Sequence, residues 1–354
     1  MPVPTCDAWS APEAVSVIQS SRLDEISGIA FPPLPPPPPS GRGAASGIAP
    51  DIAWVLEDSG NAADLIALRL STGEMVARRR ITDAAGADLT NVDWEELAIG
   101  PCPAAVAWGD AAGDGMAGSG GNAAGDSPVC AWIGDVGDNR AARTDVALIV
   151  APLPDVSGEG GDSFPRRAYI LAIQLPIAWP DGPHDTEAMA FSPDGSLHLW
   201  SKLRDGTAHG YRLSADQLMQ ATPGAALTPA PTVSVSVLKD GATPPALPPG
   251  STQPVPWRAT AAAWTGEGYV LRTYEAAWLY RPGSDAARTD GAGAPDPARA
   301  AVPAPQEPQG EAIAWDGSAL WFVSEGIHPT LWRVRCERPG PGQRADRRGQ
   351  GADP

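Results

Sequence analysis

A repeated pattern constrains the fold of this chain more than any other feature of its sequence. A polar or acidic residue precedes a short run of small and apolar residues, a turn follows, and a second apolar run ends in another polar residue. The 354 residues contain five copies, which begin near residues 25, 94, 186, 260 and 310. The third copy (186–206) is the clearest, because Pro193-Asp194-Gly195 separates its two runs as a hairpin turn does.

Each copy continues with a third apolar run, and three copies have a fourth, at 75–82, 166–175 and 232–241. Short strands rich in Val, Ile, Leu and Trp between Gly, Pro, Asp and Asn turns are typical of an all-β protein. Repeating units of up to four antiparallel strands predict a single β-propeller. We expect five blades, with the ring closed by the N-terminal run 14–20, which supplies the strand that the last blade lacks.

Two alternatives to the five-bladed ring stay open. The strands are also compatible with a β-sandwich, and a sixth blade is conceivable in the segment 283–309, which we interpret as a loop rich in Pro, Ala and Gly. We assign the propeller to residues 13–337, with a Pro-rich insertion at 32–50 and a Gly/Ala-rich insertion at 103–128. The polar tail 338–354 is expected to be disordered.

The charge of the chain excludes several classes of partner. Asp and Glu total 42 against 25 Lys and Arg, which gives a net charge of −17. Nucleic acids and anionic membranes require a basic face, so neither is an expected partner. No apolar run approaches the length of a membrane span. An acidic monomer of this kind suits a cation or a basic partner.

Charged and polar side chains recur at two fixed places in the repeat. The start of the first strand and the end of the second lie at the same face of the ring, because the two strands are antiparallel. At the first place four copies carry Glu25, Glu95 (beside Asp93), Glu187 and Glu311, and one carries Thr260. The second place carries Asp58, then Asp135, Asp138 and Asn139, then Lys202, then Arg272 and Tyr274, then Glu325. We expect all of them to converge on one mouth of the central channel.

Crowded carboxylates raise each other's pKa unless a cation neutralises them, and Ca²⁺ accepts six to eight oxygen ligands in irregular geometry. For any single Glu, a cap on its own turn is the favoured explanation, but four Glu in register favour a shared site, so we predict a calcium site. The run 135–139, with oxygen side chains around Gly137, suits either a cation or a tight structural turn. The predicted ligands are Glu25, Asp58, Asp93, Glu95, Asp135, Asp138, Asn139, Glu187, Glu311 and Glu325.

Four residues at the same mouth are the candidates for catalysis: Glu187, Lys202, Arg272 and Tyr274. The two basic side chains either hold an anionic group of a substrate beside the metal or pair with the carboxylates. Glu57 is expected to point away from Asp58, because side chains alternate along a strand. The segment 113–118 matches a dinucleotide-binding pattern, but it lies in a Gly/Ala loop instead of between a strand and a helix, so no cofactor-binding motif is assigned.

At these residues the sequence resembles a family of mostly uncharacterised bacterial β-propeller proteins, related in pattern to the phytase-like esterase propellers. The shared motifs keep their order over about residues 25–335, and the pair DWE and GDxGDN is the most specific. The matching segments are Glu25–Ala30, Asp58–Gly60, Asp93–Ala98, Gly134–Asn139 with Arg143, Thr186–Ala188, Arg272–Tyr274, Gly310–Ile313 and Ser324–Gly326. The resemblance implies a propeller, calcium and export. Phytase-type members hydrolyse phosphomonoesters with several calcium ions, and other calcium propellers are lactonases or esterases. This chain lacks the dense basic cluster expected for a highly phosphorylated substrate.

The cysteines indicate the compartment. Cys102 follows the first strand of the second blade and Cys130 opens the second strand, so in a hairpin they are cross-strand neighbours within disulfide range. Cys6 and Cys336 approach each other if the N-terminal strand closes the ring. Two disulfides predict a secreted or periplasmic protein. The alternative is a cytoplasmic protein with four free thiols, and the first residues do lack the basic and apolar segments of a signal peptide.

Two functions follow from these features. The first is an extracytoplasmic calcium-binding propeller that hydrolyses a small anionic or ester substrate, an ester or phosphoester, with the metal polarising the scissile group. The second is a non-catalytic binding propeller in which a structural calcium ion supports recognition of a protein or glycan. A propeller scaffold without metal is a third reading.

Overall fold

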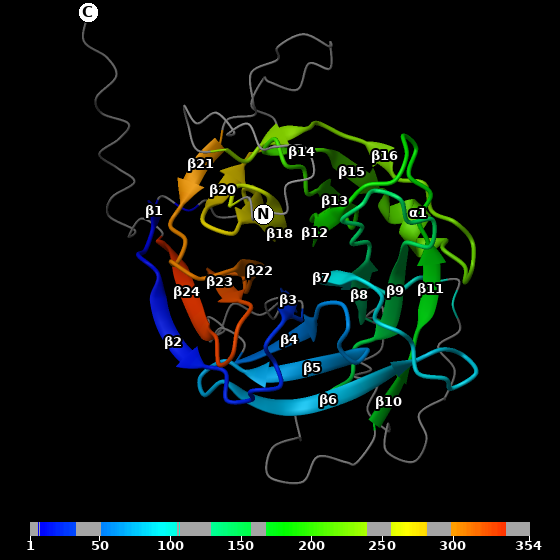
Figure 1. The fold of residues 1–354 in the computed structure, drawn as a ribbon, viewed down its shortest axis with the longest axis horizontal. Coiled ribbons are helices and arrows are strands. Elements are labelled where there is room, and N and C mark those ends of the chain that lie inside the picture. Colours follow the sequence, from blue (N-terminus) through cyan, green and yellow to red (C-terminus); the bar gives the residue numbers. More distant parts are fainter. Residues whose placement is uncertain are drawn as a thin grey trace, which may run out of the picture.

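The computed structural model describes residues 6, 8–32, 51–104, 106, 129–156, 168–238, 256–281 and 299–337. The described parts form a ring of β-sheets around a central channel (Figure 1). Apart from one short helix, α1 (Ala215–Met219), every regular element in these ranges is a strand. No described helix has the length and apolar character needed to cross a membrane. Most of both insertions, the segment 113–118 and the tail 338–354 fall outside the described residues.

Five strands line the channel, and each contacts the next in a closed circle. The five are β3 (Ile26–Ala30), β7 (Trp94–Pro101), β12 (Thr186–Phe191), β18 (Ala259–Thr265) and β22 (Gly310–Trp315). Each is the first strand of its copy of the sequence repeat. The prediction of an all-β propeller with five blades is therefore confirmed.

Each blade continues outward as an antiparallel sheet from its innermost strand. The second strands are β4 (Ile52–Glu57), β8 (Val129–Asp135), β13 (Leu197–Ser201), β19 (Gly268–Thr273) and β23 (Ala319–Ser324). The third are β5 (Asp64–Arg69), β9 (Ala147–Pro152), β15 (Gly210–Leu213), β20 (Ala277–Tyr280) and β24 (Thr330–Glu337). The fourth strands of blades one to four are β6 (Glu74–Thr82), β11 (Ile173–Pro176), β16 (Ala230–Pro231) and β21 (Arg299–Val302). A small ladder joins β14 (Thr207–Ala208) to β17 (Val235–Ser236).

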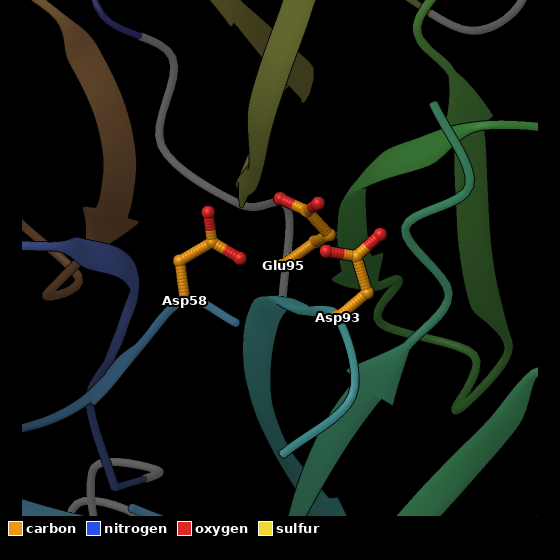
Figure 2. A group of neighbouring side chains, drawn as sticks. All are labelled: Asp58, Asp93 and Glu95. Carbon is orange, nitrogen blue, oxygen red and sulfur yellow. The ribbon is translucent and has the colours of Figure 1, made fainter. Parts of the chain in front are cut away.

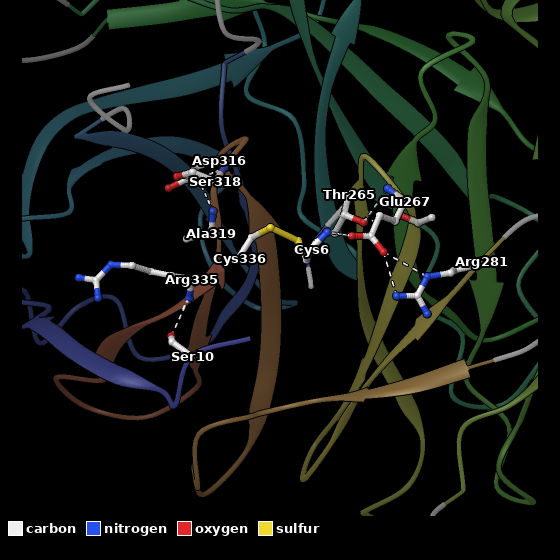
Figure 3. Close-up of a disulfide and its surroundings, with 11 residues drawn as sticks. Cys6, Ser10, Thr265, Glu267, Arg281, Asp316, Ser318, Ala319, Arg335 and Cys336 are labelled. Atoms are coloured by element: carbon white, nitrogen blue, oxygen red, sulfur yellow. Dashed lines mark hydrogen bonds and ion pairs between the residues drawn. A yellow bond between two sulfur atoms is a disulfide. The ribbon is translucent and has the colours of Figure 1, made fainter. Parts of the chain in front are cut away.

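The N-terminal segment closes the ring, as expected. Strands β1 (Ala8–Trp9) and β2 (Glu13–Val17) both pair antiparallel with β24 in the last blade. A disulfide joins Cys6 to Cys336 on the same strand, and the backbone N–H of Cys6 donates to Glu267 of blade four (Figure 3). A second disulfide joins Cys102 to Cys130. Both predicted pairs are thus present, and two disulfides favour an extracytoplasmic location.

The outer strands differ from the prediction in three places. The run 232–241 was expected as the fourth strand of blade three, but β16 directly before it takes that position, and within the described residues of the run only β17 is a strand, paired with β14. The run 166–175 is not one strand of blade two: β10 (Ala168–Leu171) pairs parallel with β6 of blade one, and only β11 joins blade two. The run passes from one blade to the next at Ala172, whose N–H donates to the carbonyl oxygen of Thr82. In blade four, β21 lies within the segment that we interpreted as a loop, and it is a fourth strand, not part of a sixth blade.

The core lies between the blades, not within a single central layer. Five clusters of buried apolar side chains fill the five gaps between neighbouring blades. Each blade is therefore buried on both faces, which explains why its strands are almost continuously apolar. Tryptophans such as Trp54, Trp132 and Trp200 fill these gaps and are almost completely buried.

Candidate metal centre at the channel mouth

A β-bulge near the start of every innermost strand builds the mouth of the channel. In each blade the pairing between the first and second strands skips one residue: Ser27, Glu95, Glu187, Thr260 and Glu311. A bulge leaves its extra residue unpaired and re-aims the side chain. The two hydroxyls connect neighbouring blades, since Ser27 Oγ donates to Trp94 O at 2.9 Å and Thr260 Oγ1 to Gly310 O at 2.9 Å. The three glutamates are left as the acidic members of this ring.

The sequence repeat made Glu25 equivalent to Glu95, Glu187 and Glu311, but the strand pairing shows that it is not. Blade one carries Ser27 at the bulge, and Glu25 lies before the start of β3. Its structural equivalents directly before the other innermost strands are Asp93, Asp185, Arg258 and Gln309. The Glu25 carboxylate accepts a hydrogen bond from Asn61 Nδ2 at 2.6 Å.

A third set of equivalent residues directly follows the second strands. Its members are Asp58, Val136, Lys202, Tyr274 and Glu325. The three sets lie at one end of the ring, as the antiparallel pairing of the first two strands requires. The expected convergence of acidic side chains on one mouth is therefore present, although not with every residue that the sequence suggested.

Two groups of carboxylates at this mouth are close enough to share a cation. The first contains Asp58, Asp93 and Glu95, whose carboxylates turn toward a common space (Figure 2). The second contains Glu95, Asp185 and Glu187. Within each group the candidate ligand oxygens all lie within 4.8 Å of one another. Glu95 belongs to both groups and is therefore the central residue of the site.

The glycine in the 135–139 run is explained by this packing. A Cβ atom on Gly137 would collide with the Glu95 carboxylate and lie 2.6 Å from Asp93 Oδ2. Any side chain at Gly137 would push the first carboxylate group apart. The GDxGDN segment thus forms one wall of the site through its backbone.

The acids of that segment bind the loop itself. Asp135 Oδ1 accepts from the Asp93 N–H at 3.2 Å and from Arg143 Nη2 at 2.9 Å. Asp138 Oδ2 accepts from the Arg143 N–H at 2.7 Å, and Asn139 is exposed. These contacts favour the structural-turn interpretation, and the structure places all three residues outside both carboxylate groups.

Glu187 and Lys202 form a buried ion pair beside the second group. The Lys202 ammonium also lies 5.3 Å from the centre of the Tyr274 ring. Burial alone would lower the pKa of Lys202, but the carboxylates of Glu187, Glu311 and Glu95 hold it well above its ordinary value. Glu187 is only 1 % exposed, and its Oε2 has no hydrogen-bond partner within the described part of the chain.

Glu311 and Glu325 lie on the blade-five side of the mouth and share one partner. Gln309 Nε2 donates to Glu325 Oε2 at 2.5 Å and to Glu311 Oε1 at 3.2 Å. Neither residue belongs to the two carboxylate groups. They add negative charge to the mouth, and burial together with Glu311 raises the pKa of Glu325 to about 8.

Arg272 is displaced from the position predicted for it. Its guanidinium lies between blades four and five, where Nη1 donates to Val323 O at 2.9 Å and to Ala312 O at 2.5 Å, and Nη2 pairs with Glu307. It also stacks over Phe322, with 5.2 Å to the ring centre. Arg272 lies within β19 and faces the next blade, whereas Tyr274 follows the end of the strand and reaches the mouth. The structure thus assigns Arg272 to inter-blade packing.

Three residues of the mouth were missed by the sequence interpretation. Asp185 belongs to the second carboxylate group, and its Oδ2 accepts from Arg258 Nη2 at 2.8 Å. Asp185 and Arg258 each directly precede an innermost strand, as Asp93 does in blade two. Glu96 accepts from the backbone N–H groups of Leu97 at 3.0 Å and Ala262 at 3.1 Å. It reaches from blade two to blade four and fills the channel below the acids.

Burial gives the site's carboxyl groups unusually high pKa values. Burial raises the pKa values of Glu95 and Glu187 well above the ordinary range. The negative charge of Glu187 raises the pKa of Glu95 further. The charges of Asp185 and Glu311 do the same for Glu187. Burial and the Asp58 carboxylate raise the pKa of Asp93 to about 6. In the metal-free protein, part of the cluster therefore carries protons that a bound cation would displace.

These shifts predict the pH dependence of the metal-free protein. A carboxyl group whose pKa is higher in the folded than in the unfolded chain binds more protons when folded, so stability falls as pH rises through the folded pKa. With Asp93 at about 6 and Glu325 at about 8, we expect the chelated protein to melt at a lower temperature at pH 8 than at pH 5. Thermal unfolding after chelation measures this. Equal melting temperatures, or a higher one at pH 8, would contradict the assigned shifts.

Comparisons with known proteins found only distant similarity. No protein-family model matches the sequence. No curated protein matches it either. Among solved structures, the chain is similar to the PQQ-bound aldose sugar dehydrogenase from Streptomyces coelicolor, with 12% identity, 94% of this chain and 100% of that chain covered, and a TM-score of 0.42.

Two further solved structures are similarly distant. An inactive virginiamycin B lyase from Staphylococcus aureus, bound to quinupristin, is 9% identical over 93% of this chain and 99% of that one, with a TM-score of 0.37. A β-propeller domain from Myceliophteria thermophila is 11% identical over 88% and 83%, with a TM-score of 0.32. The function of this chain is therefore argued from its own site.

Proposed function

We propose that this protein is an extracytoplasmic calcium-binding β-propeller that hydrolyses a small anionic ester or phosphoester at its acidic channel mouth. The observation that carries the proposal is the pair of carboxylate groups joined by Glu95. The sequence resemblance to phytase-like esterase propellers supports the same class of activity.

The donor atoms suit a hard divalent cation. Every candidate ligand is a carboxylate oxygen, which is the ligand type that Ca²⁺ prefers. Among the described residues, Asp58, Asp93 and Glu95 form no ion pair with Lys or Arg, whereas Glu187 pairs with Lys202 and Asp185 with Arg258. We therefore assign the ion to the first group, where no side chain already neutralises the charge.

The second group supplies the residues for chemistry. A calcium ion bound at the first group would polarise the scissile group and lower the pKa of a bound water. The Glu187 Oε2 atom, which has no hydrogen-bond partner among the described residues, accepts the proton of the attacking water. The Lys202 ammonium, held between Glu187 and Tyr274, binds the anionic oxygen of the substrate.

Calorimetric titration tests the metal assignment directly. The protein is chelated, exchanged into metal-free buffer and titrated with Ca²⁺, and thermal unfolding is recorded with and without the ion. We expect one high-affinity site, and at a hundredfold excess over Kd a stabilisation of about 2.7 kcal/mol. Absence of binding and of a thermal shift would overturn the metal site.

A Glu187→Gln variant tests the catalytic assignment. We expect kcat/KM for p-nitrophenyl acetate or p-nitrophenyl phosphate to fall at least about tenfold, because the amide cannot accept the proton of water. Calcium affinity should stay within about threefold of wild type, because the first group is intact. Glu74→Gln is the matched control, since Glu74 is an exposed residue of blade one. Unchanged turnover in Glu187→Gln would show that the catalytic site lies elsewhere.

A non-catalytic binding propeller is the second candidate, favoured by the opposite mouth of the channel. When the bulge residue of each blade is counted as the first, the fifth residue is aromatic in four blades and Ile99 in blade two. The aromatic residues are Phe31, Phe191, Trp264 and Trp315. They line a cavity of about 110 Å³. Flat aromatic faces suit recognition of a glycan or a protein side chain. Calcium binding without turnover of any ester or phosphoester would favour this candidate.

A further inference from the structure

A second polar pocket lies outside the channel, between the N-terminal segment and blade one. Its volume is about 330 Å³, which is within the range of small-ligand sites. Its lining combines two guanidinium groups, one glutamate and an apolar wall. The residues that matter here are Arg22, Leu23, Glu57, Ala62, Met75 and Arg78.

One carboxylate oxygen of the buried glutamate of this pocket lacks a partner. Glu57 precedes Asp58 at the end of β4, and the two side chains point to opposite sides, as the alternation of the strand predicts. Glu57 is 5 % exposed, and within the described residues its Oε1 accepts no hydrogen bond. A buried acceptor left without a donor is costly, so a ligand that brings an N–H group is favoured here.

The charges around Glu57 favour a cationic donor. Arg78 is the nearest positive group, but it is engaged by Asp64, which accepts from Arg78 Nε at 2.5 Å. Asp24 and Asp64 add negative charge near the Glu57 carboxylate. An ammonium group would satisfy the unpartnered oxygen and balance this local excess.

The same pocket also offers an anion site and an apolar surface. Arg22 is exposed, and its guanidinium forms no hydrogen bond or ion pair with any residue in the described ranges. A guanidinium binds a carboxylate through two parallel hydrogen bonds. Leu23, Ala62 and Met75, which also line the pocket, provide apolar contacts.

We propose that this pocket binds a free α-amino acid with an apolar side chain. The ligand's ammonium group donates to Glu57 Oε1, its carboxylate accepts from Arg22, and its side chain packs against Leu23 and Met75. This inference rests on the pocket alone and is independent of the metal centre.

Three matched ligands test it on the full-length, chelated protein. L-leucine carries both charged groups, 3-methylbutylamine lacks the carboxylate, and 4-methylpentanoate lacks the ammonium group. Isothermal calorimetry at millimolar ligand should show binding of leucine at least about tenfold tighter than of either analogue, because each analogue loses one charge-assisted contact. Absence of leucine binding, or equal affinity for leucine and the amine, would overturn the proposal.

Two variants locate the binding site. Arg22→Gln changes an exposed residue without a partner among the described residues, so folding is preserved, and it should weaken leucine binding about tenfold or more while leaving the amine unaffected. Glu57→Gln should weaken both leucine and the amine. Glu74→Gln, on the same blade but outside the pocket, should change neither. Leucine binding that survives Arg22→Gln unchanged would refute the assigned carboxylate site.

Discussion

A Glu95→Gln variant is expected to lose high-affinity calcium binding, with Kd raised at least about a hundredfold. Glu95 is the only residue shared by the two carboxylate groups found among the described residues. Its substitution therefore removes a charged ligand from both groups at once, and the amide offers one weaker oxygen in exchange. Calorimetry on the chelated variant measures the change, and the thermal shift caused by Ca²⁺ should disappear with it.

The matched control for this experiment is Glu25→Gln. The sequence repeat placed Glu25 and Glu95 at the same position, but the bulge register separates them, and Glu25 lies outside both carboxylate groups. We expect Kd for Ca²⁺ to change by less than about threefold in Glu25→Gln. Equal losses in the two variants would mean that the ion is held by the whole mouth and not by the first group.

Serine in place of both Cys6 and Cys336 is expected to cause the largest loss of folding stability. The disulfide joins positions 330 residues apart and holds β1 and β2 against β24. Loop-closure entropy for a loop of this length gives a cost of about 6 kcal/mol. Urea unfolding, followed by tryptophan fluorescence at a fixed calcium concentration, measures this loss.

The second disulfide provides the internal comparison. Cys102 and Cys130 are 28 residues apart, so their removal should cost less, about 3 to 4 kcal/mol. Only the first pair should also expose the N-terminal strands to proteolysis, because only that pair holds the closing segment. A larger loss from the Cys102/Cys130 pair would mean that ring closure depends on strand pairing and not on the covalent bond.

The fold was predictable because its signals are local and repeated. Five copies of a strand–turn–strand pattern predicted five blades, and the positions of the cysteines within those blades predicted both disulfides. The course of 166–175 was not predictable, because an apolar run does not reveal that it passes between neighbouring sheets at Ala172.

The site was predictable as a region but not residue by residue. The repeat located the acidic mouth, yet a bulge of one residue decides whether Glu25 or Ser27 occupies the equivalent position, and a bulge leaves no signature in the letters EISG. Glu96 escaped notice for a similar reason, since its contact with Ala262 joins two blades that are not adjacent. Such contacts depend on how far a side chain reaches across the channel.

The five bulges give the mouth five structurally equivalent side-chain positions. Each presents one side chain from the same backbone geometry, yet the chain fills them with Ser27, Glu95, Glu187, Thr260 and Glu311. Blade packing does not depend on all five being acidic, so the chemistry of the mouth can diversify during evolution while the scaffold is retained. The same property makes the bulge positions a target for protein engineering, because a charge can be moved around the ring one blade at a time.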